Sequence, residues 1–247
     1  MTYGGRSDNL NRDRIDNWHR QFEKRKIGKT DKTKMGVSVK SFTVLLDGDL
    51  YVTERLMKQI GHSHIIVADG AIRFVEMLHV KPELWVGDFD STNADLKKRY
   101  RDIEKKSFPV AKDKTDGELA IDFALKKGAE RIILCGALGG KRSDHAFFHF
   151  AHALAMKENG IDVLLTSGKE EGYALLPGAY SFDLPAGTIF SLIGFDDLNG
   201  LTIEGARWPL LKKNVPFGSS LTLSNEVKGQ LNVTLSQGRA ILLATLA

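Results

Sequence analysis

Apolar and polar positions alternate in blocks along the chain from residue 41 onward. Short, mainly apolar runs occupy residues 41–46, 64–68, 84–86, 131–135 and 161–165, and the more polar residues 105–110 are expected to form a further strand. Such runs are typical of parallel strands, which are buried on both faces of a sheet. The stretches between them carry apolar residues at helical spacing and predict helices over residues 53–60, 71–79, 94–100, 115–127 and 143–158. This alternation predicts an α/β domain whose mainly parallel sheet is flanked by helices.

The pattern changes after Gly168. Short strand-like segments follow, separated by Gly, Pro or Asn, at residues 175–176, 180–184, 188–195, 200–203, 219–223, 230–235 and 239–245. With no long helical pattern between them, these segments predict an all-β C-terminal domain, a sandwich or a barrel. We therefore expect a leader over residues 1–36, an α/β domain over 37–168 and an all-β domain over 169–247.

The positive charge of the chain is concentrated in the leader. The chain holds 35 Lys and Arg against 31 Asp and Glu. Ten of these basic and five of these acidic residues lie in residues 1–36, which leaves 25 against 26 for the rest. The net charge of the chain after the leader is therefore close to zero, which argues against a nucleic-acid partner. The leader has few apolar residues, so we expect it to be disordered.

Several absences bear on location. Cys135 is the single cysteine, and it follows an apolar run, so it is expected to be a buried residue in a reducing compartment. No apolar run approaches the length of a membrane span, and the first residues show no secretory segment. These features predict a cytoplasmic protein with no membrane partner.

Asp88 and Asp90 directly follow a predicted buried strand, separated only by Phe89. In an extended segment alternate side chains share a face, so the two carboxylates would point one way and Phe89 toward the core. Two carboxylates about 5 Å apart repel by roughly 3 kcal/mol at an effective dielectric near 20. A hard cation such as Mg²⁺ would offset that repulsion. The alternative is a polar turn, because Asp is a common turn residue.

Polar residues also follow the neighbouring strands, at the sheet edge where open parallel sheets bind their ligands. Asp69-Gly70 follows the second predicted strand, the segment 112–116 follows the fourth, and 139–145 follows the fifth. Thr115 and Glu118 also fit a helix capping box, which explains both residues without any chemistry. That explanation accounts for Asp116 only weakly, so Asp116 is a candidate third metal ligand.

The glycine-rich segment Gly139 to Asp144 leads into a predicted helix. Free N–H groups at a helix start bind phosphate, and Arg142 adds a planar fork that suits phosphate oxygens. The segment is not a Walker loop, because the Gly-Lys-Ser/Thr ending is missing. The alternative is a tight turn with Ser143 as the helix N-cap.

Two weaker signals remain. His149 and His152 lie three residues apart and could pair as metal ligands, but the surrounding phenylalanines favour a packed helix. In the β region, Trp208 with Ser224 and Asn225 would offer an aromatic plane and polar groups to a flat heterocycle. Loop packing and turn formation are the alternative for these three residues.

Taken in order, these segments resemble the thiamine pyrophosphokinase family. The resemblance spans residues 41–247 and rests most on Gly-Asp-Phe-Asp-Ser at 87–91, Lys-Asp-Lys-Thr-Asp at 112–116 and Ser-Asn-Glu at 224–226. It implies transfer of the pyrophosphoryl group of ATP to the hydroxyethyl oxygen of thiamine, giving thiamine diphosphate and AMP. It also implies Mg²⁺ and a homodimer whose active sites lie at the subunit interface.

The resemblance implies roles for the residues that match its motifs. Asp88, Asp90 and Asp116 would hold the metal and handle the pyrophosphoryl group, with Arg142 as a further catalytic residue. The expected nucleotide-binding residues are Asp69, Gly70, Lys112, Thr115, Asp144 and His145. The expected thiamine-binding residues are Trp208, Ser224 and Asn225. The general base stays open between Asp69 and Asp116.

The chain departs from the family pattern at two positions. Ala71 directly follows Gly70, where the family usually has a second glycine, and Lys141 is an extra residue before Arg142. We align Arg142 with the family arginine because Asp144 then keeps its spacing. The alternative gives that role to Lys141.

Two other functions stay open. A nucleotide-sugar glycosyltransferase also holds a divalent metal with an Asp-x-Asp pair, but it does not explain the Lys-Thr-Asp segment and the glycine-rich segment on the same rim. A non-catalytic nucleotide- or thiamine-binding module would share the fold. The presence of every acidic position argues against that module.

Overall fold

The computed structural model describes residues 39–89, 94–107 and 113–246, so the leader and parts of two loops lie outside the described residues. The α/β part contains β1 (Ser41–Leu45), β2 (His64–Ala68), β3 (Leu84–Gly87), β4 (Glu104–Ser107), β5 (Arg131–Cys135) and β6 (Asp162–Thr166). These strands are hydrogen-bonded in the order β4-β3-β2-β1-β5-β6, and every neighbouring pair is parallel. The predicted parallel sheet is therefore confirmed.

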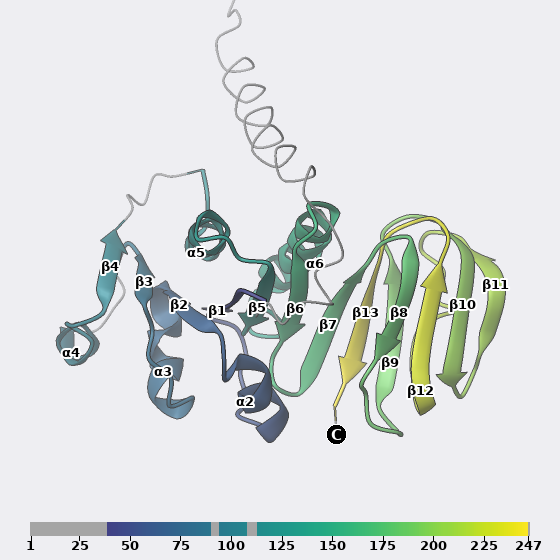
Figure 1. The fold of residues 1–247 in the computed structure, drawn as a ribbon, viewed down its shortest axis with the longest axis horizontal. Coiled ribbons are helices and arrows are strands. Elements are labelled where there is room, and N and C mark those ends of the chain that lie inside the picture. Colours follow the sequence, from purple (N-terminus) through teal and green to yellow (C-terminus); the bar gives the residue numbers. More distant parts are fainter. Residues whose placement is uncertain (1–38, 90–93, 108–112, 247) are drawn as a thin grey trace, which may run out of the picture. The chain divides into compact units, whose positions relative to one another are not determined.

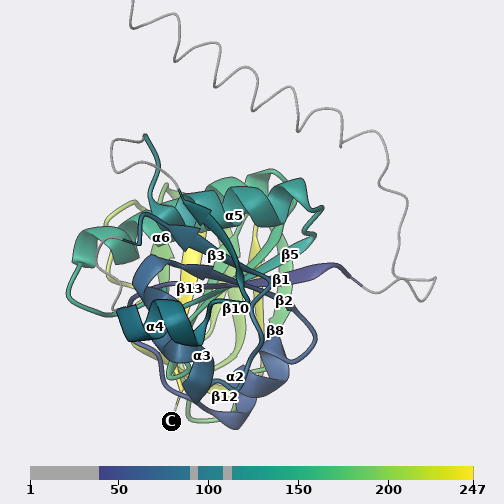
Figure 2. The ribbon, with the colours of Figure 1, turned by 90° about the vertical axis from the view of Figure 1, so that its left-hand side faces the viewer.

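Helices cover both faces of this sheet (Figure 1). The helices are α2 (Glu54–Ile60), α3 (Phe74–Met77), α4 (Ala94–Arg99), α5 (Asp116–Lys126) and α6 (Ser143–Glu158), with a 3₁₀ helix η3 (Asp69–Arg73) before α3. Helices α5 and α6 lie on one face, and α2 and α3 lie on the other (Figure 2). Among the described residues, no helix is long and apolar enough to span a membrane.

The C-terminal region is built from antiparallel strands, as predicted. They are β7 (Glu170–Leu175), β8 (Gly178–Phe182), β9 (Ile189–Gly194), β10 (Leu198–Ala206), β11 (Leu210–Val215), β12 (Asn225–Leu235) and β13 (Ala240–Thr245). Strand β7 pairs antiparallel with β6, and β13 and β9 follow it in the same sheet. The boundary expected near residue 168 thus falls in the β6–β7 turn, and the sheet continues across it.

Several elements of the structure differ from those predicted. Residues 219–223 were expected to form a strand but form turns, while β11 at residues 210–215 was not predicted. Most side chains of β11 are exposed, so its sequence shows no alternation of buried and exposed positions. The helix expected at 71–79 begins instead as η3 and continues as the short α3. The start of η3 at Asp69 has a φ of +36°, which sets a turn directly after β2.

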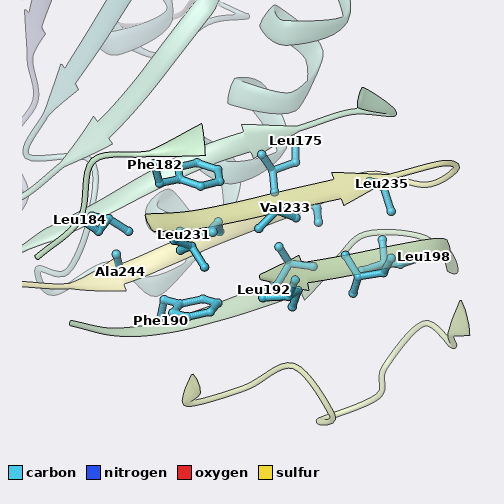
Figure 3. Packing of buried hydrophobic residues seen from close by; sticks show 14 of the residues in the cluster. Leu175, Phe182, Leu184, Phe190, Leu192, Leu198, Leu231, Val233, Leu235 and Ala244 are labelled. Atoms are coloured by element: carbon cyan, nitrogen blue, oxygen red, sulfur yellow. The ribbon is translucent and has the colours of Figure 1, made fainter. Parts of the chain in front are cut away.

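Two clusters of buried apolar side chains stand out among the described residues. One lies between the parallel sheet and the helices α2, η3 and α3, and includes Trp85, Leu56 and Ile72. The other fills the β region, where Phe190, Leu231 and other inward-facing side chains meet (Figure 3). Burial of such side chains contributes about 1.5–3 kcal/mol each.

A buried carboxylate links helix α2 to strand β7. Glu171 is fully buried and accepts hydrogen bonds from Arg55 Nε at 2.7 Å, Arg55 Nη2 at 2.9 Å and Gln59 Nε2 at 2.6 Å. The Tyr173 hydroxyl donates to the same carboxylate. Burial by itself raises the pKa of Glu171, but the hydrogen bonds from Arg55, Tyr173 and Gln59 outweigh it and hold the pKa below its usual value. The carboxylate therefore stays charged, and Arg55 is its ionic partner.

Removing Arg55 should be costly for the whole fold. We expect Arg55→Ala to lower the free energy of unfolding by about 3 kcal/mol, because it leaves the Glu171 charge buried without its ionic partner. Urea denaturation measures this change.

The matched control is Lys58→Ala on the same helix. Lys58 and its partner Glu54 are 80% and 93% exposed, so the control should cost less than about 0.5 kcal/mol. Equal losses in the two variants would contradict the role given to the buried pair.

Candidate active site

The carboxyl ends of β1, β2, β3 and β5 and the starts of α5 and α6 surround a cleft of about 1020 Å³. Seven of the residues expected at a site line this cleft: Asp69, Gly70, Asp88, Thr115, Asp116, Arg142 and His145. Asp144 does not line it, and neither do Trp208, Ser224 or Asn225. Asp90 and Lys112 lie outside the described residues.

The end of β3 is fixed by packing against the core. Phe89 has a φ of +61°, and its ring meets the Trp85 ring edge-on with 4.9 Å between centroids. Phe89 thus packs against the core as predicted, but the extended backbone on which that prediction rested is wrong, because the residue is left-handed. The Trp85 Nε1–H donates to the Asp69 carbonyl oxygen at 2.9 Å, which ties the end of β2 to β3. A Cβ at Gly87 would lie 3.0 Å from Asp69 Oδ1, so glycine lets the Asp69 carboxylate lie against β3.

Two further aspartates of the cleft were missed by the sequence analysis. Asp47 and Asp49 follow β1 and line the cleft beside the expected residues. Asp47 forms an ion pair with Arg73, and Asp49 Oδ2 accepts a hydrogen bond from the Gly140 N–H at 2.9 Å. A signal was present, because Asp47-Gly48-Asp49 repeats the Asp-x-Asp spacing at the end of a predicted strand.

The start of α5 has the predicted capping box. The Glu118 N–H donates to Thr115 Oγ1 at 3.2 Å, and the Thr115 N–H donates to Glu118 Oε2 at 2.9 Å. Thr115 and Glu118 therefore have a structural role at the helix start. Asp116 is the first residue of α5, where the helix dipole favours a negative charge, and it also lines the cleft.

The glycine-rich segment enters α6 without a side-chain cap. The N-cap position is occupied by Arg142, which makes no capping hydrogen bond, so the alternative with Ser143 as N-cap is wrong. Two successive residues before the helix, Gly139 and Gly140, have a left-handed backbone, with φ of +69° and +83°. These angles favour glycine.

Arg142 and Asp144 form an exposed bidentate pair. Arg142 Nε donates to Asp144 Oδ1 at 2.9 Å, and Nη2 donates to Oδ2 at 2.6 Å. The hydrogen bond from Arg142 lowers the pKa of Asp144 to about 2. Arg142 lines the cleft and Asp144 does not. The role that fits Asp144 is therefore to hold the Arg142 guanidinium in place, and not to contact a ligand itself. Lys141 lines the cleft as well, so the cleft has two cationic side chains at this corner.

The cleft offers hard oxygen donors for a metal ion. Carboxylates of Asp47, Asp49, Asp69, Asp88 and Asp116 lie along one rim, and oxygen ligands suit Mg²⁺. Within the described ranges, no three His, Cys, Asp or Glu side chains are grouped closely enough to hold an ion in this conformation. What fits a hard cation is the type of donor, because carboxylate oxygens are the ligands that such a cation prefers.

The aromatic residue expected to hold thiamine lies on the surface of the β region. Trp208 is 55% exposed, and Arg207 lies over its ring at 4.9 Å from the centroid. Buried Asn225 fixes the Trp208 backbone: its Nδ2 donates to the Trp208 carbonyl at 2.8 Å, and its Oδ1 accepts from the Trp208 N–H at 3.1 Å. Ser224 has a φ of +56°, and its N–H donates to Ser191 Oγ at 3.0 Å. Asn225 and Ser224 thus shape the loop that displays Trp208.

Comparisons with known proteins agree on one family. Residues 56–165 match the model of the thiamin pyrophosphokinase catalytic domain, and residues 181–242 match that of the thiamin pyrophosphokinase vitamin B1 binding domain. A thiamine pyrophosphokinase of Bacillus subtilis (strain 168) is 31% identical over 148 residues, which cover 57% of this chain and 67% of the relative.

Solved structures show the same fold. The crystal structure of thiamine pyrophosphokinase from Bacillus subtilis has a TM-score of 0.75 at 24% identity, covering 84% of this chain and 99% of that chain. The yeast thiamin pyrophosphokinase has a TM-score of 0.67 at 14% identity, covering 86% of this chain and 88% of that chain. At these identities the likeness establishes the fold alone.

Gly136 lines the cleft, and a side chain at this position should destabilise the fold. Its φ is +77°, and a Cβ would lie 2.3 Å from the Leu46 carbonyl oxygen. We expect Gly136→Ala to lower the free energy of unfolding by about 3 kcal/mol, from left-handed backbone strain and overpacking together. Thermal or urea unfolding measures this loss.

Gly128→Ala separates the two contributions. Gly128 has a similar φ of +88°, but a Cβ there would meet no atom within 4 Å. The control should lose only about 1 kcal/mol, from backbone strain alone. If Gly136→Ala lost no more than Gly128→Ala, the close approach at the cleft floor would have no energetic weight.

Proposed function

The chain belongs to the thiamine pyrophosphokinase family, and we propose that its polar cleft transfers the pyrophosphoryl group of ATP to thiamine. The products are thiamine diphosphate and AMP. One observation carries the proposal: the acidic ends of β1, β2 and β3 line the same cleft as the glycine-rich segment and the start of α6. Neither the glycosyltransferase nor the binding-module alternative finds support in the comparisons.

Phosphoryl-type transfer depends mainly on positioning and charge neutralisation. The hydroxyethyl oxygen of thiamine attacks the β-phosphorus, the bond from that phosphorus to the α,β-bridging oxygen breaks, and AMP leaves with the electron pair. The hydroxyl proton passes to a carboxylate of the cleft, for which Asp69 and Asp116 are the candidates. The chain's contribution is to hold the two reactants in line and to offset the charge on the leaving AMP.

Mg²⁺ is part of this proposal. Asp88 and Asp116 would hold it, together with Asp90 from the sequence motif. When bound, a divalent cation neutralises phosphate charge and polarises the phosphorus. The supporting observation is the chemistry of the rim, where carboxylate oxygens gather without a matching number of basic side chains.

The opposite corner of the cleft suits the phosphates of ATP. Backbone N–H groups at the start of α6 offer donors to anionic oxygens, and the helix dipole adds a partial positive charge. Arg142 donates hydrogen bonds to Asp144 from Nε and Nη2, so its other N–H groups could donate to a phosphate oxygen. Stabilising the departing charge with fixed donors is a large term in such reactions.

Activity should depend on the acidic rim. With ATP, Mg²⁺ and thiamine, the purified protein should release AMP in a thiamine-dependent way. We expect Asp88→Asn and Asp116→Asn each to reduce that release by at least about 100-fold, because each removes a charged ligand from the cation. Chromatographic separation of AMP from ADP measures the reaction.

Asp102→Asn is the matched control, since Asp102 is 92% exposed and does not line the cleft. Its activity should equal that of the unmodified protein. Thiamine-independent ADP, or full activity in Asp88→Asn, would contradict pyrophosphoryl transfer at this rim.

We also propose that two copies form a homodimer and complete each site together. Trp208, Ser224 and Asn225 do not line the cleft, so one chain does not bring the expected thiamine residues to the phosphates. The same β region exposes large apolar side chains, Ile189, Leu211, Phe217, Leu221 and Leu223. A partner copy would cover this surface and bring the cleft and Trp208 together.

Mixed dimers test shared sites. Co-expression of the inactive variants Asp116→Asn and Trp208→Ala should restore up to about a quarter of the activity, because half of the dimers are mixed and each has one intact site. Mixing Asp116→Asn with Asp88→Asn should restore nothing, because both residues belong to the same cleft. Absence of recovery in the first mixture would place thiamine within a single chain.

A cytoplasmic location is the last part of the proposal. The supporting observation is Cys135, which is fully buried in β5, where burial raises the pKa of its thiol to about 12. An inert buried thiol fits a reducing compartment, and it agrees with the reading of Cys135 as a small core residue.

A further inference from the structure

One buried polar side chain in the cleft wall has no assigned role. His149 lies on α6, lines the cleft and is 8% exposed. Its Nδ1 atom is buried and has no hydrogen-bond partner among the described residues. Burying an imidazole nitrogen without a partner costs free energy, so the protonation of this sealed nitrogen decides what the rest of the ring can offer to the cleft.

The His149 ring is uncharged at neutral pH. Burial, with a smaller contribution from the neighbouring His152 and His145, lowers its pKa to about 4. A neutral imidazole carries one N–H and one lone pair. Because a buried N–H without a partner is rarer in proteins than an under-satisfied acceptor, the proton belongs on Nε2 and the lone pair on the sealed Nδ1. With Nδ1 sealed, Nε2 is the ring nitrogen left for a ligand of the cleft, and there it would act as a neutral donor.

The surroundings indicate which part of a ligand this donor meets. His145 lies one turn earlier on α6, closer to the helix start and to the cationic Lys141 and Arg142. Residues four apart on a helix differ by about 6 Å along its axis, so His149 lies that much farther from the phosphate corner than His145. Apolar Ala137 and Ala146 line the same cleft. An uncharged donor beside apolar wall suits a neutral acceptor and gains little from a phosphate.

We propose that His149 is a nucleoside-binding residue that donates a hydrogen bond to a neutral oxygen or nitrogen of the nucleotide's ribose or base. The proposal rests on the function argued above, since it concerns the nucleotide of that reaction. It assigns the phosphates to the start of α6 and the uncharged end of the nucleotide to the second turn of the same helix.

His152 is the matched control. It lies one turn farther along α6, its Nδ1 is also buried without a partner in the described part of the chain, and burial lowers its pKa as well. It differs in one respect, because it does not line the cleft. Any general effect of removing a buried histidine from α6 should therefore appear in His152→Phe as well as in His149→Phe.

The test compares binding of ATP with binding of inorganic tripolyphosphate by calorimetry, both with Mg²⁺. We expect His149→Phe to weaken ATP binding about fivefold, the usual weight of one neutral hydrogen bond, and to leave tripolyphosphate binding unchanged. His149→Gln keeps an N–H donor and should lose less. His152→Phe should change neither affinity. Should His149→Phe fail to fold, as judged by thermal unfolding, His149→Met takes its place.

Two outcomes would overturn the proposal. Unchanged ATP affinity in the folded apolar variant would show that His149 makes no contact with the nucleotide. Equal weakening of ATP and tripolyphosphate would show that its effect reaches the phosphates or the whole cleft. Thiamine-dependent AMP release by the unmodified protein tests the function separately, so a protein that releases AMP but shows either result refutes the role of His149 alone.

Discussion

The close approach of two backbone segments, at Gly48 and Gly136, is the constraint on which the cleft depends. The Leu46 N–H donates to the Cys135 carbonyl at 2.7 Å, and the Gly48 N–H donates to the Gly136 carbonyl at 3.1 Å. A Cβ at either glycine would lie 2.3 Å from a carbonyl oxygen of the other segment. This contact carries the β1–β5 pairing past the end of the sheet. It brings the aspartates after β1 under the glycine-rich segment after β5, where Asp49 reaches Gly140.

Much of the fold could be predicted because burial imposes a period on the sequence. Strands such as β2 and β5 are apolar after their first residue, since both of their faces are covered, and Ser143–Glu158 is helical within the predicted bounds. The prediction failed where burial is weak. Strand β11 is paired mainly through its backbone and leaves Leu211 74% exposed, so no side-chain pattern marks it. The opposite error, at 219–223, arose because apolar residues there sit on exposed turns.

The candidate site was predictable to the extent that strand ends define it. Parallel topology alone places Asp69, Asp88 and Asp116 on one rim, and the structure lines the cleft with all three. Side-chain partners could not be read in the same way. The Arg142–Asp144 pair depends on the rotation of the first turn of α6, and the burial of His149 depends on how α6 packs on the sheet. Such features follow from tertiary packing, for which residue spacing carries no direct signal.

The rim also shows how a chain tolerates many carboxylates at one place. Two of them about 5 Å apart repel by roughly 3 kcal/mol at an effective dielectric near 20, so an acidic rim needs compensation within the fold. Arg73 offsets the charge of Asp47, and the Gly140 N–H offsets that of Asp49. The second contact has a further meaning, because an N–H of the glycine-rich segment already holds an anionic oxygen there. The contact that helps to stabilise the acidic rim thus places an N–H of the glycine-rich segment on an anionic oxygen, the kind of contact that such backbone concavities make.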